Sequence, residues 1–234
     1  MLDGPDPVKA LTAFRDGPWQ DPAASMLGSE QEAWLDHAMA ASVRSGQRWQ
    51  VVAFGTVLGK LRVPDDAMTW VKPGATRRAR RYFEKGTIGS RLGLPLTYDN
   101  WGGYPAARAR FLASAQGMGA NLVVVCGDSH NAWAFDLAQE GKPAGVEFAG
   151  HSVTAPGLER ATAPDPSVIA RSMVGANPEL KWCDTSRRGY MATTLTPERV
   201  RNDWVFVDTV LRRDPGASVG YSTSVERGRN GMAS

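Results

Sequence analysis

Residues 121–131 read NLVVVCGDSHN, an apolar run followed directly by glycine and then by polar residues. The apolar run before Gly127 is typical of a strand that is covered on both faces in an α/β sheet. Gly127 lacks a Cβ atom, so the chain can turn sharply there. Because α/β sheets bind ligands beyond the carboxyl ends of their strands, we expect Asp128, His130 and Asn131 to line one cavity.

Elements upstream of this strand predict a layered α/β fold. Residues 29–32 read SEQE, a capping box that begins a helix whose Trp34 face is expected to pack against the core. Residues 49–55 are rich in β-branched and aromatic side chains and end in glycine, as strands of covered sheets often do. Residues 105–117 begin with proline and end with glycine, and they predict a second amphipathic helix.

The ends of the chain are expected to be irregular, and its second half to be rich in strands. Residues 1–27 are rich in Pro, Gly, Asp and Ala without periodicity, which indicates a segment without regular structure. Further strands are expected at residues 145–149, 190–195 and 204–211. Residues 214–234 lack apolar mass and are predicted to be a disordered tail, so that the domain spans residues 1–213.

Composition restricts the class of protein without choosing one. A chain of 234 residues that is 42% hydrophobic can fill one substantial core. The net charge of +3 permits an anionic ligand, but it does not indicate nucleic acid as a partner other than as a substrate. No stretch approaches the roughly 18 apolar residues of a membrane helix, and the first residues lack an export signal. The sequence therefore predicts no membrane contact and leaves the compartment open.

The spacing of Asp128 and His130 suits metal binding. The two residues are separated by one position and could both point inward from an irregular loop. A carboxylate and an imidazole together suit iron, manganese or zinc, and a carboxylate can bridge two cations. The alternative is structural: Asp128 would cap residues 133–136 as a helix, and His130 would be buried and satisfied. Both interpretations remain open, because the motif is short.

The longer run NLVVVCGDSHNAWAFDL at residues 121–137 resembles the last metal-binding segment of the alkaline phosphatase D (PhoD-like) metallophosphoesterases. Four other segments agree with that family in order and spacing. They are MLGSEQEAWLDHAMAAS at 26–42, YDNWGGYPAARARFL at 98–112, GVEFAGHSVTAPG at 145–157 and RRGYMATTLTPERVRNDW at 187–204. The resemblance covers nearly everything from residue 26 to residue 210.

The resemblance implies a four-layer α/β/β/α sandwich that hydrolyses phosphate mono- or diesters at alkaline pH. It also implies a bimetal centre of iron with calcium, or of another pair of divalent ions. Asp128 and His130 fall on catalytic metal-ligand positions, and His151 is either a further metal ligand or a structural histidine. The candidate substrate-binding residues are Asn131, Arg188 and Tyr190.

The departures from the family concern the N-terminal half of the enzyme. Its metal-binding Cys segment, its Gly-Asp-X-X-Tyr-X-Asp-like loop and its Asp-Asp-His-Glu-like stretch do not occur in this sequence. The chain has three histidines, and His37 lies on the first predicted helix, where a surface role is expected. Gly102 stands where the family more often has Asp after Trp101. We therefore expect the chain to be similar to the C-terminal part alone, with the N-terminal half as its missing partner.

Rival functions rest on isolated features. Gly216–Gly220 matches the Gly-X-Ser-X-Gly pattern of serine hydrolases, but no histidine follows Ser218. Cys126 could be a nucleophile beside a histidine, although a small buried strand residue explains it better. The cluster Arg77–Arg81 could steer phosphate or bind nucleic acid, or it could be a solvated helix face. A catalytically inert fragment and a non-enzymatic binding module also stay open.

Overall fold

The computed structural model describes residues 6–213 and 216–233. Within these ranges the helices are α1 (Pro7–Arg15), α2 (Ser29–Arg44), α3 (Arg77–Arg91), α4 (Pro105–Gly117) and α5 (Pro166–Ala176). The strands are β1 (Gln50–Phe54), β2 (Leu122–Cys126), β3 (Ala132–Gln139), β4 (Lys142–Ala149), β5 (Leu180–Asp184), β6 (Gly189–Leu195), β7 (Arg199–Val207) and β8 (Ala217–Glu226). Short 3-10 helices are η1 (Pro18–Gln20), η2 (Asp65–Trp70), η3 (Trp101–Gly103) and η4 (Leu158–Arg160). None of the described helices is long and apolar enough to cross a lipid bilayer.

The larger sheet has five strands in the order β1-β2-β4-β3-β5. Strands β1, β2 and β4 run parallel, whereas β3 is antiparallel to both of its neighbours. Strand β2 has a partner on each side and is buried along almost its whole length, which confirms the predicted central strand. Strand β1 lies at one edge of the sheet, so one side of its backbone has no partner strand among the described residues.

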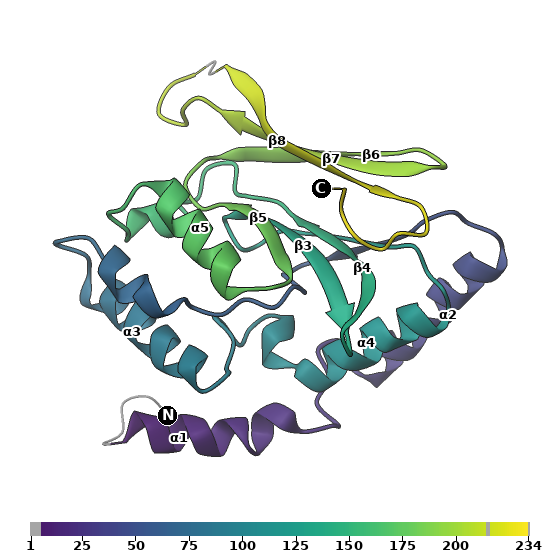
Figure 1. Ribbon diagram of the computed structural model, residues 1–234, viewed down its shortest axis with the longest axis horizontal. Helices are drawn as coiled ribbons and strands as arrows, with labels where there is room; N and C mark the ends of the chain where they lie inside the picture. The colour runs from purple at the N-terminus through teal and green to yellow at the C-terminus, as the bar shows by residue number, and fades with distance from the viewer. Residues whose placement is uncertain (1–5, 214–215, 234) are drawn as a thin grey trace.

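Alternate side chains of β2 enter two separate cores. Leu122 and Val124 belong to the core that contains Phe111 of α4. Val123 points to the opposite face and belongs to the core that contains Trp204 of β7. The molecule is therefore layered as helices, five-stranded sheet and three-stranded sheet, with α2 and α4 on one side and β6–β8 on the other (Figure 1). The predicted α/β fold class is confirmed.

The smaller sheet has the antiparallel order β6-β7-β8. Trp204 of β7 is fully buried, and its indole nitrogen donates a hydrogen bond of 3.0 Å to the carbonyl oxygen of Ala149, which ties the two sheets together. The opposite face of β7 is polar and carries the ion pair between Arg201 and Asp203. Among the described residues no helix covers this outer face, so the four-layer sandwich stays a prediction (Figure 1).

The prediction of a disordered tail after residue 213 is wrong. Residues 217–226 form β8, which pairs with β7 along its whole length. This strand lies at a sheet edge, where backbone pairing stabilises it and only Thr223 and Val225 are buried. Its sequence therefore contains no apolar run that would predict a strand. Residues 214, 215 and 234 of that segment lie outside the described ranges.

The first segment is also more regular than expected. Residues Pro7–Arg15 form α1, whose first turn is capped by the Asp6 side chain accepting a hydrogen bond of 2.9 Å from the Lys9 backbone nitrogen. Leu11 is the buried residue of this helix. Asp and Pro at residues 6 and 7 form a helix-start signal that the absence of apolar periodicity in this segment obscures. Residues 1–5 lie outside the described part of the chain.

Helix α2 begins where expected, but its cap and its packed face differ from the prediction. Its N-cap is Gly28, with no side-chain hydrogen bond, and Ser29 already lies inside the helix. Trp34 is 69% exposed, whereas Met39 is buried and Leu35 packs beside it. Residues 35, 39 and 43 also recur at helical spacing, and this face begins one position after Trp34, so periodicity alone could not choose between the two faces.

Strand boundaries in the second half shift by a few residues. The expected strand at 204–211 is β7 at Arg199–Val207, which follows a tight turn closed by a 2.8 Å hydrogen bond from the Thr196 nitrogen to the Arg199 oxygen. The alternative helix at 133–136 is wrong, because these residues lie in β3. Strands β3 and β5 and helix α5 had no predicted counterpart.

Candidate functional site

Three parallel strands end at the same edge of the larger sheet. Phe54 of β1 pairs with Cys126 of β2, and Cys126 pairs with Ala149 of β4. The loop at residues 127–131 therefore leaves the sheet between the ends of two neighbouring strands, where polar side chains can meet. The expected position of the Asp-X-His motif at the end of a central strand is confirmed.

The backbone of this loop is held in an uncommon conformation. Asp128 has a φ angle of 64° and His130 one of 60°, both in the left-handed region. Gly127 does not have a positive φ, and a Cβ atom added there would meet nothing within 4 Å. The turn is thus made by Asp128 and His130 and not by the glycine, contrary to our expectation. Left-handed residues other than glycine cost about 1–3 kcal/mol each and cluster at functional sites.

Ser129 holds the loop in this shape. Its hydroxyl accepts a 2.7 Å hydrogen bond from the Trp133 indole nitrogen and donates one of 2.8 Å to the Asn131 carbonyl oxygen. Trp133 is fully buried, so the loop is anchored to the core. The strained residues on either side of Ser129 are therefore fixed by the fold and not by their own preferences.

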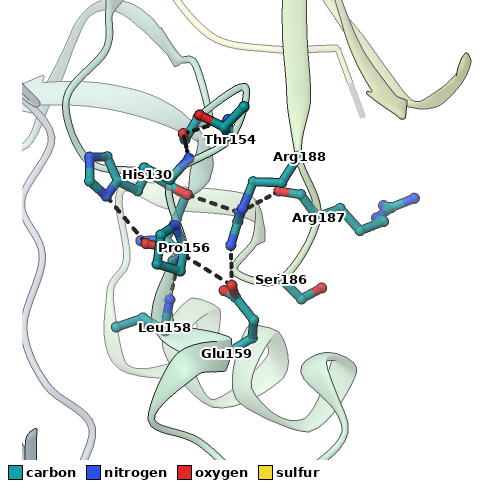
Figure 2. A network of polar contacts seen from close by, with 12 residues as sticks. His130, Thr154, Pro156, Leu158, Glu159, Ser186, Arg187 and Arg188 are labelled. Atoms are coloured by element: carbon teal, nitrogen blue, oxygen red, sulfur yellow. Dashed lines mark hydrogen bonds and ion pairs between the residues drawn. The ribbon is translucent and has the colours of Figure 1, made fainter. Parts of the chain in front are cut away.

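Asp128 and His130 both present their side chains to solvent. The His130 Nδ1 atom lies 3.2 Å from the Pro156 carbonyl oxygen (Figure 2). Because a carbonyl oxygen can only accept, Nδ1 carries the proton, and in the neutral ring Nε2 keeps its lone pair. Metal-binding histidines are commonly oriented by such a bond from the other ring nitrogen. The geometry suits an exposed ligand and argues against the buried, satisfied histidine.

Asn131 is buried and fixes the loop to a second segment. Its Oδ1 atom accepts a 3.1 Å hydrogen bond from the Leu158 nitrogen, and its Nδ2 atom donates one of 2.8 Å to the Ser129 oxygen. A Cβ atom at Gly157 would overlap Asn131 Oδ1, so glycine is needed for this approach. The substrate-binding role of Asn131 stays a prediction, and its amide is already engaged with backbone groups.

Arg188, directly before β6, contacts the backbone of the loop. Its guanidinium forms an ion pair with Glu159 and donates a 3.3 Å hydrogen bond to the His130 carbonyl oxygen (Figure 2). A third hydrogen bond, of 2.6 Å, reaches the Arg187 carbonyl oxygen. These contacts place Arg188 next to the backbone of His130 and stabilise it there. Its substrate-binding role remains a prediction, since its charge is already paired.

His151 lies between the two sheets, next to the same edge. It is 8% exposed, and its Nε2 atom lies 3.2 Å from the Val205 carbonyl oxygen, which makes Nε2 the protonated nitrogen. Burial lowers the pKa of His151, although the Val205 contact opposes the shift. Its buried Nδ1 atom has no hydrogen-bond partner among the described residues. Whether this lone pair serves a metal or is only structural stays a prediction.

Tyr190 is placed apart from the loop. It is 53% exposed on β6, where its neighbour Met191 packs between the sheets and Tyr190 therefore faces outward. The structure brings Asp128, His130 and Asn131 into one loop, but it places Tyr190 on the outer face of the smaller sheet. Its predicted contact with a substrate stays a prediction.

Asp184 was missed by the sequence analysis. It ends β5 opposite Ala132, at the edge from which the candidate loop leaves. Burial would raise the pKa of Asp184, but hydrogen bonds from the backbone nitrogens of Ser186 and Arg187 and from the Arg187 side chain outweigh it and lower the pKa. The signal would have been the aspartate at the end of the run LKWCD, had β5 been recognised as a strand.

Two rival nucleophiles lose support. Ser218 lies within β8 opposite Phe206, and not on a turn between a strand and a helix. Burial raises the pKa of the Cys126 thiol, and the neighbouring Glu147 raises it further, so Cys126 is a buried strand residue and a poor nucleophile.

The described residues do not complete a two-metal centre. No group of three or more His, Cys, Asp or Glu side chains in the described chain could hold a metal ion. A bimetal site needs on the order of four to six donors for each ion. Asp128 and His130 could supply two of them.

The fold and the loop together define a two-sheet α/β protein with a polar, strained turn at the carboxyl edge of its central strand. A family model described as PhoD-like phosphatase matches residues 6–204. The chain belongs to the PhoD-like phosphatase family.

Two relatives show how much of such a protein the chain represents. It is 26% identical over 211 residues to alkaline phosphatase D of Bacillus subtilis (strain 168), which covers 88% of this chain and 30% of that protein. A solved structure titled "Structure of PhoD" matches with a TM-score of 0.67 and 24% identity, covering 92% of this chain and 36% of that one. The chain thus spans about a third of the length of these relatives, and the second comparison supports the fold alone.

Proposed function

We propose that this chain is the C-terminal portion of a metal-dependent phosphoric ester hydrolase and contributes Asp128 and His130 to its metal centre. The observation that carries the proposal is the orientation of His130. Pro156 holds the Nδ1 proton, which leaves the Nε2 lone pair on an exposed ring at the end of a central strand. Membership of the PhoD-like phosphatase family supplies the chemical class, a phosphate mono- or diester as substrate.

The other metal ligands would come from the N-terminal half of the longer protein. The described residues fall short of a dinuclear site, and the chain spans 30% of its curated relative. An iron and calcium pair is the expected centre. The same half would provide the fourth layer of the sandwich, over the outer face of the smaller sheet.

A second surface expected to contact this half lies between α2 and β1. An open cavity of about 760 Å³ there is lined mainly by these two elements. Trp34 is 69% exposed beside it, and Val51 on the unpaired edge strand is 45% exposed. An apolar groove next to a free strand edge favours pairing with a further strand of the same protein.

The test combines the chain with the N-terminal portion of a PhoD-like phosphatase and measures hydrolysis of p-nitrophenyl phosphate with iron and calcium added. We expect the combination to be active and the chain alone to be nearly inactive. His130→Ala and Asp128→Ala should each lower the rate by about 100-fold, as loss of a metal ligand or its support does.

His37→Ala is the matched control, because His37 is exposed on α2 and takes no part in the site. It should leave the rate unchanged. Hydrolysis that survives His130→Ala would refute the proposed ligand. A stable complex without activity would favour the alternative, a catalytically inert fragment or binding module.

A further inference from the structure

A basic cavity lies between the start of α3 and the turn that contains η4. Its volume is about 380 Å³. One wall is formed by residues 72–83 and the other by residues 157–161. The walls are joined by a 3.0 Å backbone hydrogen bond from the Lys72 nitrogen to the Ala161 oxygen and by a β-bridge between Val71 and Thr162. The cavity is therefore part of the folded framework.

The charge of the lining has one sign. Lys72, Arg78 and Arg160 line the cavity, and no acidic side chain does. Within residues 6–213 and 216–233, none of these three cations forms an ion pair. Glu159, which is next to Arg160 in the sequence, already forms an ion pair with Arg188. Several unpaired cations around a concave surface attract an anion.

The basic surface continues past the cavity along α3. Arg78 and Tyr82 also line a second, more open hollow of about 470 Å³ together with Arg77, Arg81 and Lys85. Three arginines of the cluster recognised in the sequence, Arg77, Arg78 and Arg81, therefore lie on one side of α3.

The cavity and the candidate site share a wall. The turn at residues 156–158 faces the cavity through Gly157 and Leu158. The same turn is hydrogen bonded on its other side to His130, through Pro156, and to Asn131, through Leu158 (Figure 2). An anion in the cavity would thus lie against the turn that is hydrogen bonded to the loop carrying His130.

We propose that this cavity binds a second anionic group of the substrate, a phosphate or carboxylate remote from the ester that is cleaved. This inference rests on the proposed phosphoesterase function and specifies its substrates as molecules with two separated anionic groups. Arg78 and Arg160 bind that group, and Lys72 adds a third positive charge to the lining.

The first test measures binding and needs no activity. Inorganic pyrophosphate is titrated into the 234-residue chain in a calorimeter, without added metal. We expect binding that weakens roughly tenfold or more in Arg78→Gln/Arg160→Gln, since charge-assisted hydrogen bonds are lost. Arg44→Gln/Arg48→Gln is the matched control, with the same change of charge at exposed arginines near the end of α2. Absence of binding, or equal loss in both double variants, would overturn the proposal.

The second test distinguishes a substrate group from a free anion. In the complex with an N-terminal portion, KM is compared for an aryl phosphate with and without a distal carboxylate. Arg78→Gln/Arg160→Gln should raise KM roughly tenfold for the doubly anionic substrate alone. Equal effects on both substrates would refute the substrate assignment. His130→Ala should abolish hydrolysis and leave pyrophosphate binding intact. This result would support the metal-ligand role of His130 independently of the anion-binding cavity.

Discussion

The carboxylate of Glu147, in the middle of β4, accepts a 2.8 Å hydrogen bond from the backbone nitrogen of Leu58. The nitrogen of Gly59 donates a second bond of 2.6 Å to the same carboxylate, which is completely buried. Arg108 completes the arrangement by donating a 2.8 Å bond to the Leu58 oxygen. The loop that follows β1 is therefore attached to the sheet by one buried acid.

Removing this acid should destabilise the fold strongly. Glu147→Ala leaves two buried backbone nitrogens without acceptors, and we expect a loss of about 2–5 kcal/mol in the free energy of unfolding. Glu147→Gln should cost less, because its amide oxygen still accepts one of the bonds. Urea denaturation measures both, with exposed Glu84→Ala as the control. A loss below 1 kcal/mol in Glu147→Ala would contradict the role assigned to the carboxylate.

Stability should depend on pH through the same residue. Burial raises the pKa of Glu147 above its ordinary value of 4.5, and the Leu58 nitrogen only partly opposes the shift. As the pH rises above 4.5, the unfolded chain loses this proton before the folded chain does, so the unfolded state gains stability. The free energy of unfolding should therefore fall with rising pH until the folded pKa is passed. Parallel profiles for the native protein and Glu147→Gln would contradict this.

The left-handed backbone at His130 should be visible in paired substitutions. Glycine tolerates a φ of 60° and alanine does not, so His130→Gly should be more stable than His130→Ala by about 1 kcal/mol. Both variants lose the contact with Pro156, which therefore cancels. At Ser129, whose φ is not positive, the order should be reversed. Thermal denaturation of the four variants gives the comparison, and the same order at both positions would refute the strain.

The groove between α2 and β1 should make the isolated chain self-associate. Trp34→Gln removes apolar surface from α2, and Val51→Lys adds a charge at the free strand edge. Each substitution should shift the chain towards monomer. Leu195→Gln, on the smaller sheet, is the control for loss of an exposed apolar side chain. Sedimentation velocity measures the change. A chain that is already monomeric at high concentration would contradict the prediction.

Sequence alone could predict the elements whose burial is continuous. Strand β2 and helix α4 were predicted almost residue by residue, because an apolar run and a Pro-to-Gly helix leave few alternatives. Strand β8 and the packed face of α2 were not. An edge strand needs little apolar mass, and Trp34 had the expected helical spacing although the neighbouring face lies against the core.

The position of the candidate site could be predicted from the sequence, but the hydrogen bonds and the ion pair that hold its loop could not. The motif of Asp128 and His130 was apparent from the polar residues after a buried strand. The bonds from His130 to Pro156 and from Arg188 to Glu159 join residues 26 and 29 positions apart, and no local pattern encodes them. Asp184 was missed for the same reason, since its place at this edge depends on a strand pairing between β3 and β5.

The close approach of Gly157 to the Asn131 amide restricts how these two positions can vary during evolution. A side chain at residue 157 can be accommodated only if residue 131 becomes shorter, so each position determines which mutations the other tolerates. Gly157→Ala should be harmful beside Asn131 and less harmful beside Ser or Gly at residue 131, where the new Cβ atom would still lie 3.0 Å from the His130 carbonyl oxygen. A substitution of Gly157 during evolution should therefore follow a substitution of Asn131 by a shorter residue.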